Sequence, residues 1–275
     1  MKYLISCLLI FSYIKAFDYK LTPIKLNENS YYFYGKEEYF SSLNAGDISN
    51  VSFIITQNSV ILIDTGSSYE YGLQIKEAIQ KVTKNPIKYI INTHHHPDHF
   101  LGNSAFTQSD IFATPYTKEE ISKNGDLYLL NLVNLVQSAM KNTSIKAPNQ
   151  LLSTEDLEFD GYKLKLLYLD AHTKSDLAIY DEKTKILYAS DLVFYKRTPA
   201  TSHANIQKWI KALEELQKID YSILIAGHGI SSTSKEPIKE NIAYLKFLDE
   251  TLKQKTKNGL DIFEILEKPI PKEFE

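Results

Sequence analysis

Apolar and polar positions alternate along this chain in patterns that predict a mixture of strands and helices. Val51 to Thr56 and Val60 to Asp64 are two β-branched, apolar runs, and the turn residues Gln57-Asn58-Ser59 separate them. This arrangement is typical of a β-hairpin. Tyr71 to Thr83 then repeats apolar side chains at helical spacing, and Asn85-Pro86 ends the predicted helix.

The rest of the chain repeats the same mixture. Further helices are predicted at about 127–141, 204–218 and 237–253. Further strands are predicted at 87–92, 111–113, 163–169, 177–180, 186–189 and 222–226, with a hairpin turn at 181–184. Strand runs with interspersed helices on this scale indicate an α+β chain in which sheets pack together and helices lie outside them.

Length and composition narrow the classes of protein. With 275 residues, of which 43% are hydrophobic, the chain is large enough to bury a full core, and we expect residues 17–275 to form one domain. The 31 basic residues are outnumbered by 34 acidic ones, for a net charge of −3. Because nucleic-acid binding needs clustered Lys and Arg, this balance argues against a nucleic-acid partner. The sequence leaves the oligomeric state open.

The first sixteen residues have the features of a secretory signal peptide. Lys2 supplies a positive charge, Tyr3 to Ile14 is apolar, and Ala16 is a small residue at the expected cleavage position. The apolar run is shorter than the about 20 residues that a transmembrane helix needs, so we expect no stable membrane insertion once this segment is removed. We interpret Cys7 as part of the run rather than as a lipoprotein attachment site. These features predict secretion across the inner membrane, to the periplasm.

The segment from Thr93 to His99 carries the densest group of candidate metal ligands. Four of them occur within six residues, namely His94, His96, Asp98 and His99. In an extended backbone, side chains alternate between faces, so the first two converge while His95 points away. Pro97 turns the chain, which lets the last two approach the same point from a second direction. Because histidines and carboxylates are costly to bury without a partner, the pattern indicates a divalent metal site.

Three later segments share one form, in which an apolar strand ends and a candidate ligand follows. These ligands are His172 after Leu164 to Leu169, Asp191 after Ile186 to Ser190, and His228 after Ile223 to Ala226. Gly227 and Gly229 flank the last histidine and would let the backbone come close to another group. Loops at strand ends are where a rigid scaffold gathers functional groups. Together with the dense histidine segment, these ligands predict one shared metal site.

These motifs resemble the complete motif set of the metallo-β-lactamase superfamily. The matching residues are His94-x-His96-x-Asp98-His99, His172, Asp191 and His228, and Val60-Ile-Leu-Ile-Asp64-Thr-Gly66 resembles the early hairpin motif. The likeness spans about residues 48–230, with the motifs in family order. It implies a four-layer αββα sandwich with the metals at one edge, between two sheets.

The resemblance also implies how the ligands would be shared. His94, His96 and His172 would hold one metal, Asp98, His99 and His228 a second, and Asp191 would bridge both. Imidazole and carboxylate ligands suit two Zn²⁺ ions per chain, and Fe or Mn could take their place. Two zinc ions that share a water would lower its pKa from roughly 15.7 towards about 7, which gives a bridging hydroxide at neutral pH. Asp98 is the candidate catalytic carboxylate.

Residues near the ligands are candidates for supporting roles. Asp64 and Thr173 could orient ligand imidazoles or carboxylates, although Asp64 could equally be a turn residue at a strand end. Lys196 and Arg197 closely follow the bridging aspartate, and either could bind a substrate carboxylate or be a surface residue. Of the two, Arg is better suited to bidentate recognition.

Departures from the better-known branches of the family narrow the choice. Asp191 stands where one large β-lactamase subclass has cysteine, and Phe194 stands where that subclass has lysine. The catalytic tyrosine of quorum-signal lactonases is missed by one position, at Tyr195. The closest likeness is to the exported zinc metallohydrolases of quinoprotein relay systems and of sulfur-oxidation gene clusters. Residues 91–99, 191–199 and 227–229 carry this likeness, which does not imply a particular substrate.

The leading hypothesis from the sequence is an exported dinuclear zinc hydrolase with a small-molecule substrate. It would use a metal-bridging hydroxide on a small ester, thioester, lactone or amide. A mononuclear iron persulfide dioxygenase, which would use the first-site residues, is one alternative, and a non-catalytic metal-binding protein is another. His203 and Trp209 lie outside these motifs, and we interpret both as structural.

Overall fold

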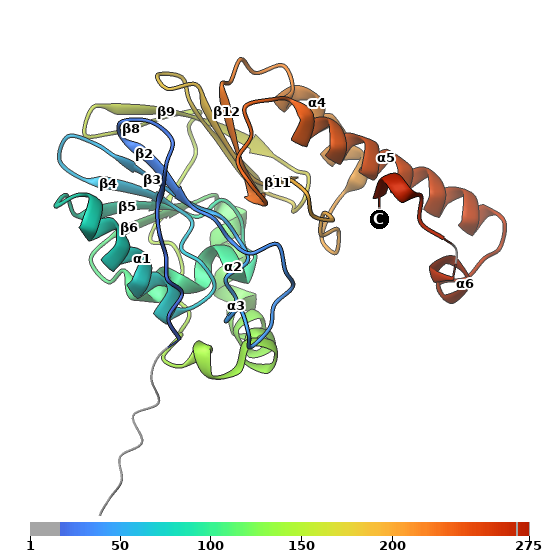
Figure 1. The fold of residues 1–275 in the computed structure, drawn as a ribbon, viewed down its shortest axis with the longest axis horizontal. Helices are drawn as coiled ribbons and strands as arrows, with labels where there is room; N and C mark the ends of the chain where they lie inside the picture. Colours follow the sequence, from blue (N-terminus) through green and yellow to red (C-terminus); the bar gives the residue numbers. More distant parts are fainter. Residues whose placement is uncertain (1–16, 268, 275) are drawn as a thin grey trace, which may run out of the picture.

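In the computed structural model, which describes residues 17–267 and 269–274, two β-sheets pack face to face between two layers of helices (Figure 1). On the outer side of one sheet lie α1 (Tyr69–Val82), α2 (Pro97–Phe100) and α3 (Pro115–Val136). The outer side of the other sheet is covered by α4 (Ile206–Leu216) and α5 (Glu236–Lys257). These four layers confirm the predicted αββα sandwich. The predicted signal peptide, with Cys7, lies outside the described residues.

The sheets differ in how their strands are connected. The described strands of the first sheet, in spatial order, are β1 (Ile24–Lys25), β2 (Ser30–Phe33), β3 (Val51–Ile55), β4 (Val60–Ile63), β5 (Ile87–Ile91), β6 (Asp110–Ala113) and β7 (Gln150–Leu151). Those of the second sheet are β12 (Ile223–His228), β11 (Ile186–Phe194), β10 (Asp176–Asp181), β9 (Tyr162–Leu169) and β8 (Asp156–Phe159). The predicted hairpin of β3 and β4 is confirmed by their antiparallel pairing. The shorter elements are η1 (Leu101–Ala105), η2 (Gln137–Met140), α6 (Ile262–Leu266) and η3 (Lys272–Phe274).

Three apolar clusters separate the four layers, and they follow from the period-two alternation of strand side chains. Along β3, Phe53 packs toward the helices and Ile54 packs toward the second sheet. In β4, Leu62 and Ile61 divide in the same way. A third cluster around Trp209 fills the space between the second sheet and α4 and α5. The central strands are therefore buried on both faces, which holds the strand ends in fixed positions.

Some element boundaries differ from the prediction. The helix predicted at 127–141 begins at Pro115, because Thr114 caps its first turn and proline suits the first helical position. The strand predicted at 186–189 continues to Phe194, so Asp191 lies inside a strand rather than just beyond one. His228 is likewise the last residue of its strand.

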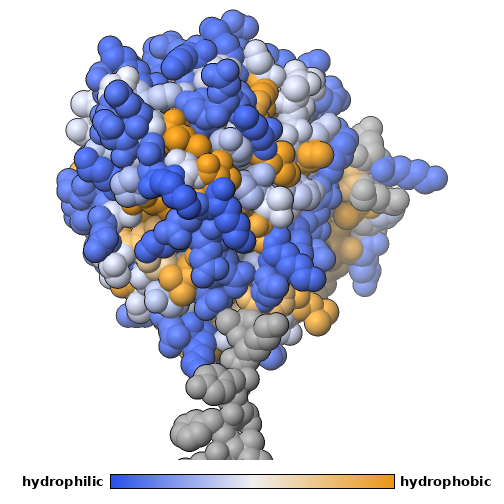
Figure 2. All heavy atoms as spheres, turned by 60° about the vertical axis from the view of Figure 1, so that its left-hand side comes forward, coloured by the Kyte–Doolittle hydropathy of each residue, from blue (hydrophilic) through white to orange (hydrophobic). Residues whose placement is uncertain are grey.

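The face of the molecule seen in Figure 2 is dominated by hydrophilic side chains, with apolar ones scattered between them. The large apolar side chains that are exposed include those of Leu127 and Leu130 on α3. Among the described residues, none of the helices combines the length and the apolar character needed to cross a membrane.

Candidate metal centre

The first group of candidate ligands comes from three strands. His94 and His96 follow β5, His172 follows β9, and Asp191 lies in β11. One ligand atom from each of the four lies within 4.8 Å of the others. His96 Nδ1 is 2.9 Å from His172 Nε2, and Asp191 Oδ2 is 3.4 Å from that same His172 nitrogen. The structure thus brings together the three histidines that the sequence assigned to one metal.

The second group consists of Asp98, His99 and His228, whose ligand atoms also lie within 4.8 Å of one another. Asp98 Oδ2 is 3.6 Å from His99 Nε2 and 3.4 Å from His228 Nε2. Asp191 reaches this group too, because its Oδ1 is 3.1 Å from His99 Nε2 and its Oδ2 is 3.4 Å from His228 Nε2. Its carboxylate therefore lies between the two groups, at the position expected of a bridging ligand.

Asp191 reaches this central position because β11 is irregular there. The pairing of β11 with β12 shifts in register on both sides of Ser190, whose φ is +47°. Gly227 of β12 leaves room for the approach, since a Cβ atom there would collide with the Asp191 carboxylate. Gly229 has a φ of +98°, and a Cβ atom there would collide with the Tyr195 carbonyl. The close approaches expected from these two glycines are confirmed.

Asp64 supports the second group from behind. His99 Nδ1 donates a hydrogen bond of 2.8 Å to Asp64 Oδ2. The backbone N–H and the hydroxyl of Thr93 donate to the same carboxylate, each at 2.8 Å. Asp64 is only 2% exposed and has a φ of +62°, just after β4. The carboxylate thus joins a ligand imidazole to the start of the histidine-rich loop, which is the geometry of a residue that orients a ligand.

Thr173, the other candidate supporting residue, directs its hydrogen bonds to Asp176. Its backbone N–H and its hydroxyl donate to the two carboxylate oxygens at 2.8 and 2.7 Å. Burial raises the pKa of Asp176 to about 7, although these hydrogen bonds lower it. Thr173 therefore shapes the turn that follows His172 and orients the ligand only through the backbone.

Asn50 fixes the strand end that carries His228, and no sequence pattern indicated it. Its Nδ2 donates to the carbonyls of Ala226 at 2.9 Å and Gly229 at 2.7 Å. Its backbone N–H donates to the carbonyl of Gly227 at 2.7 Å. These partners are all backbone groups more than 170 residues away in the sequence, so side-chain motifs carry no signal for them.

Burial and neighbouring charges shift the pKa values of the ligands in opposite directions. Burial lowers the pKa of His94 well below its usual range and that of His172 to about 4, so both imidazoles are neutral. Burial also lowers the pKa of His99, but three carboxylates, led by that of Asp191, outweigh it and raise this pKa well above its usual range. Burial raises the pKa of Asp191, but the facing histidines outweigh it and hold this pKa well below its usual range.

The ligand atoms fit divalent metal ions. Within the described residues, His94 Nε2, His99 Nε2 and Asp191 Oδ1 are buried and have no hydrogen-bond partner. Such unpaired buried groups cost about 1–3 kcal/mol each, a cost that coordination to a metal would remove. Neutral imidazoles together with carboxylates are the donor set that zinc prefers. The seven residues therefore form a candidate metal centre with two sets of ligands.

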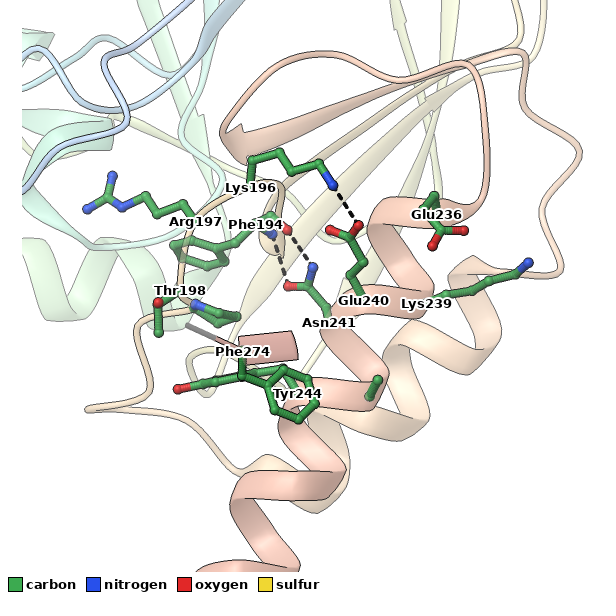
Figure 3. A pocket seen from close by; sticks show the side chains of 12 residues that line it. Phe194, Lys196, Arg197, Thr198, Glu236, Lys239, Glu240, Asn241, Tyr244 and Phe274 are labelled. Atoms are coloured by element: carbon green, nitrogen blue, oxygen red, sulfur yellow. Dashed lines mark hydrogen bonds and ion pairs between the residues drawn. The ribbon is translucent and has the colours of Figure 1, made fainter. Parts of the chain in front are cut away.

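Lys196 and Arg197 diverge from each other beside this centre. Figure 3 shows Lys196 extending toward α5, where its Nζ lies 2.8 Å from Glu240, while Arg197 extends away from α5. Arg197 Nη1 and the carbonyl oxygen of Ile48 both lie 2.7 Å from His228 Nδ1. Because a carbonyl can only accept, the Nδ1–H donates to Ile48. His228 Nδ1 therefore offers no lone pair to the Arg197 guanidinium, whose N–H groups can bind another acceptor.

A pocket of about 700 Å³ adjoins the centre on this side (Figure 3). Its walls come from the loop after β11, from α5 and from Phe274. Phe194 lines the pocket and also stacks on the His228 ring, with centroids 4.9 Å apart and planes inclined by 12°. The charged residues of the loop and of α5 share the pocket with the aromatic rings of Tyr244 and Phe274.

Three further side chains surround the first group. His95 belongs to neither of these two ligand groups, and its ring faces the tyrosines of α3, but one of its nitrogens lies within 4.8 Å of nitrogens of His96 and His203. Trp209 is buried and packs edge-on against His172, with centroids 5.0 Å apart, which agrees with a structural role. His203 was also interpreted as structural, but its Nδ1 lies 2.8 Å from Nε2 of His96. Its distance from the motifs along the chain hid this contact.

The sequence profile described as the metallo-beta-lactamase superfamily matches residues 44–228 of the chain. This range is about two thirds of the chain and contains every candidate ligand as well as Asp64.

Two relatives are each 21% identical to the chain. One is a linear primary-alkylsulfatase of Pseudomonas sp. (strain ATCC 19151), aligned over 253 residues that cover 76% of this chain and 47% of that protein. Another is a beta-lactamase-like protein 2 homolog of Caenorhabditis elegans, aligned over 222 residues that cover 79% of this chain and 65% of that protein. The chain thus spans about half the length of the first relative and just under two thirds of the second.

Solved structures share the fold. A metallo-beta-lactamase from Pontibacter korlensis has a TM-score of 0.67 at 18% identity, covering 82% of this chain and 99% of its own. The DIM-1 metallo-beta-lactamase, in a crystal exposed to ceftazidime, has a TM-score of 0.65 at 18% identity, covering 83% of this chain and 97% of its own. At these identities the likeness shows the fold alone.

Proposed function

The chain belongs to the metallo-β-lactamase superfamily, and from this premise we propose that it is a dinuclear zinc hydrolase of a small ester, thioester, lactone or amide. Membership supports a metal-dependent hydrolase, because one relative is named a linear primary-alkylsulfatase. One observation carries the two-ion proposal. The Asp191 carboxylate lies 3.1–3.7 Å from histidine nitrogens of both ligand groups, as a shared ligand must.

Each group would have a distinct task in hydrolysis. Two zinc ions, held by the groups on either side of Asp191, would supply Lewis acidity and a water with a pKa lowered towards about 7. Asp98 faces the nitrogens of His99 and His228, which places its carboxylate to orient the attacking water and to hold its proton. Asp64 keeps the His99 ring in one orientation, so that Nε2 faces the centre throughout the reaction.

Arg197 and the adjoining pocket support a substrate with a negative charge. The guanidinium lies beside His228 at the pocket wall and is well shaped for a carboxylate or a sulfate. Lys196 is a weaker candidate, because it is paired with Glu240 and extends toward α5. Tyr244 and Phe274 would contact an organic group of the substrate. Anionic esters, sulfate esters included, are therefore the substrates to test first.

Export to the periplasm is part of the same proposal. It is supported by the positive charge at Lys2 and by the apolar run from Tyr3 to Ile14. Fractionation of cells that express the full chain, with immunodetection of a shortened form in the periplasm, tests it. A full-length product confined to the cytoplasm would contradict export and would leave the hydrolase proposal untouched.

Elemental analysis together with a hydrolase substrate panel tests the activity. We expect close to two zinc ions per chain, and we expect Asp98→Asn to abolish turnover while Asp126→Asn, an exposed change on α3, leaves it intact. A stably folded chain that binds no metal and is inactive would overturn the proposal. Oxygen uptake that needs a persulfide and one bound iron would replace it by the dioxygenase alternative. Unchanged turnover in Asp98→Asn would favour the non-catalytic alternative.

A further inference from the structure

His203 makes a contact with the candidate metal centre that the ligand motifs do not include. Its Nδ1 lies 2.8 Å from Nε2 of His96, a residue 107 positions earlier in the chain. The other nitrogen of His96, Nδ1, faces the first ligand group at 2.9 Å from His172 Nε2. The His96 ring is thus held between the centre on one side and His203 on the other.

The protonation of His96 follows from this geometry. A metal ligand must offer an unprotonated nitrogen, so a His96 ring that binds a metal through one nitrogen carries its only proton on the other. If Nδ1 offers the lone pair, Nε2 must carry the proton and needs an acceptor. The Nδ1 atom of His203 lies 2.8 Å from Nε2 of His96, where that acceptor is needed.

Other ligand histidines have comparable partners for the nitrogen that faces away from the centre. His99 donates from Nδ1 to Asp64, and His228 donates from Nδ1 to the carbonyl of Ile48. Such partners fix the orientation and the tautomer of a ligand imidazole. His203 differs from them because it is an exposed side chain on a loop.

The loop that carries His203 is tied to the site at its far end. The backbone N–H of Asn205 donates to the carbonyl of Ala171 at 2.9 Å, next to the ligand His172. The N–H of Ala204 donates to Thr201 at 3.1 Å within the same loop. These bonds place the imidazole beside His96, just before α4, of which Asn205 is the N-cap.

We propose that His203 is a positioning residue that accepts the Nε2–H of His96 and thereby sets its Nδ1 to bind the first metal ion. The inference rests on the proposed metal-dependent function. Its expected effect is that of a lost outer partner, a loss of roughly 10–100-fold in affinity for the ion at the first group.

Three substitutions of His203 distinguish the loss of a hydrogen bond from the loss of side-chain volume. His203→Ala removes the acceptor, and His203→Gln places its amide near the former Nε2 position. His203→Asn keeps an amide oxygen close to the former Nδ1 position and should therefore preserve the affinity for zinc. Ser202→Ala, on the neighbouring exposed residue, is the matched control.

The measurement is competition between each protein and a chelator for zinc, with Co²⁺ absorption and the NMR signal of the His96 Nε2–H as readouts besides activity. We expect His203→Ala and His203→Gln to lose 10–100-fold in affinity for one of the two ions and to lose the NMR signal. His203→Asn and Ser202→Ala should keep the zinc affinity within about threefold of the wild-type value and should keep the NMR signal. A lost partner would lower the affinity by at least about tenfold.

Equal affinities in all four variants and the wild type would overturn the positioning role. So would a third equivalent of zinc in the wild type that disappears in His203→Ala, because His96 Nε2 would then be bound to a metal. A wild-type chain that loads metal, shows the expected variant pattern and hydrolyses nothing would overturn the proposed function alone. A wild-type chain that binds no metal would overturn both.

Discussion

Nδ1 of His99 donates a hydrogen bond of 2.8 Å to Oδ2 of Asp64, and both side chains are almost completely buried. Because Nδ1 is bound to Asp64, Nε2 is the nitrogen that faces Asp191, 3.1 Å away. The same carboxylate accepts two hydrogen bonds from Thr93, at the start of the loop that carries the other ligands. The Asp64 side chain therefore orients His99, a ligand of the second group. It also fixes the backbone at Thr93, just before the ligands of the first group.

Asp64→Asn should weaken metal binding without unfolding the chain. The amide keeps the shape of the carboxylate but has one acceptor oxygen instead of two. It therefore cannot accept all the hydrogen bonds that Thr93 and His99 donate. We expect a loss of roughly 10–100-fold in affinity for the ion of the second group, and a similar loss of turnover. Chelator competition measures it, with Asp126→Asn as the control. Affinity equal to that of the wild type would show that Asp64 only terminates β4.

Gly227→Ala should displace the bridging carboxylate. A Cβ atom there would collide with Asp191, whereas one at Gly161 meets none of the described atoms within 4 Å. Overpacking costs about 1–3 kcal/mol, and we expect the second equivalent of zinc to be lost as well. Gly161→Ala is the control. Its added Cβ atom meets no neighbour, so the φ of +76° leaves backbone strain as the only expected cost, about 1–2 kcal/mol. Full metal loading in Gly227→Ala would contradict the tight approach.

Asn50→Ala should lower stability and loosen His228. The change leaves the buried carbonyls of Ala226 and Gly229 without their side-chain donor, at about 1–3 kcal/mol for each unpaired group. Urea denaturation and zinc stoichiometry measure the two effects. Asn58→Ala in the exposed turn between β3 and β4 is the control. If both variants unfold at the same urea concentration, the clamp on β12 does not contribute to stability.

Arg197→Ala should lower the activity on anionic substrates more than the activity on neutral ones. A charged hydrogen bond contributes about 1.5–3 kcal/mol, so we expect kcat/KM for an anionic ester to fall by roughly 10–100-fold. A neutral ester of similar size should lose less than threefold, and Arg197→Lys should restore part of the loss, because lysine keeps the charge without the planar fork. Equal losses on both substrates would assign Arg197 to the support of His228 instead.

The sequence predicted the elements in which local pattern and tertiary environment agree. The β3–β4 hairpin was predictable because both strands are mostly apolar and are buried on two faces. The start of α3 was missed because residues 115–126 are mostly polar and carry little helical periodicity, while the informative residues are Thr114 and Pro115 at its cap.

The candidate ligands were predictable because metal coordination demands particular residue types at strand ends. Their partners were not, because these contacts join distant segments through backbone carbonyls or single side chains. Asn50 bonds to carbonyls beyond residue 225, and His203 reaches His96 across 107 residues. The position of Asp191 inside β11 depends on a register shift that only the pairing with β12 reveals.

Asp47 lies outside the metal centre and carries a pH-dependent contribution to stability. It is 5% exposed and accepts a hydrogen bond of 3.0 Å from the hydroxyl of Tyr71. Burial raises the pKa of Asp47 to about 6, although this hydrogen bond lowers it. In the unfolded chain the carboxyl has its ordinary pKa of 3.8. The folded state therefore binds the proton more tightly, and the free energy of unfolding falls as the pH rises from about 4 to about 6.

Asp47→Asn should remove this dependence, because the amide is neutral at every pH and its oxygen still accepts from Tyr71. We expect the variant to gain on the wild type by up to about 3 kcal/mol between pH 4 and pH 6.5, since each of about two pKa units corresponds to about 1.4 kcal/mol. Urea denaturation at matched metal content measures this difference, in which the pH dependence of metal binding cancels. Asp126→Asn, an exposed change on α3, is the control. A difference for Asp47→Asn that is constant or shrinks with pH would mean that the native state holds this carboxyl charged.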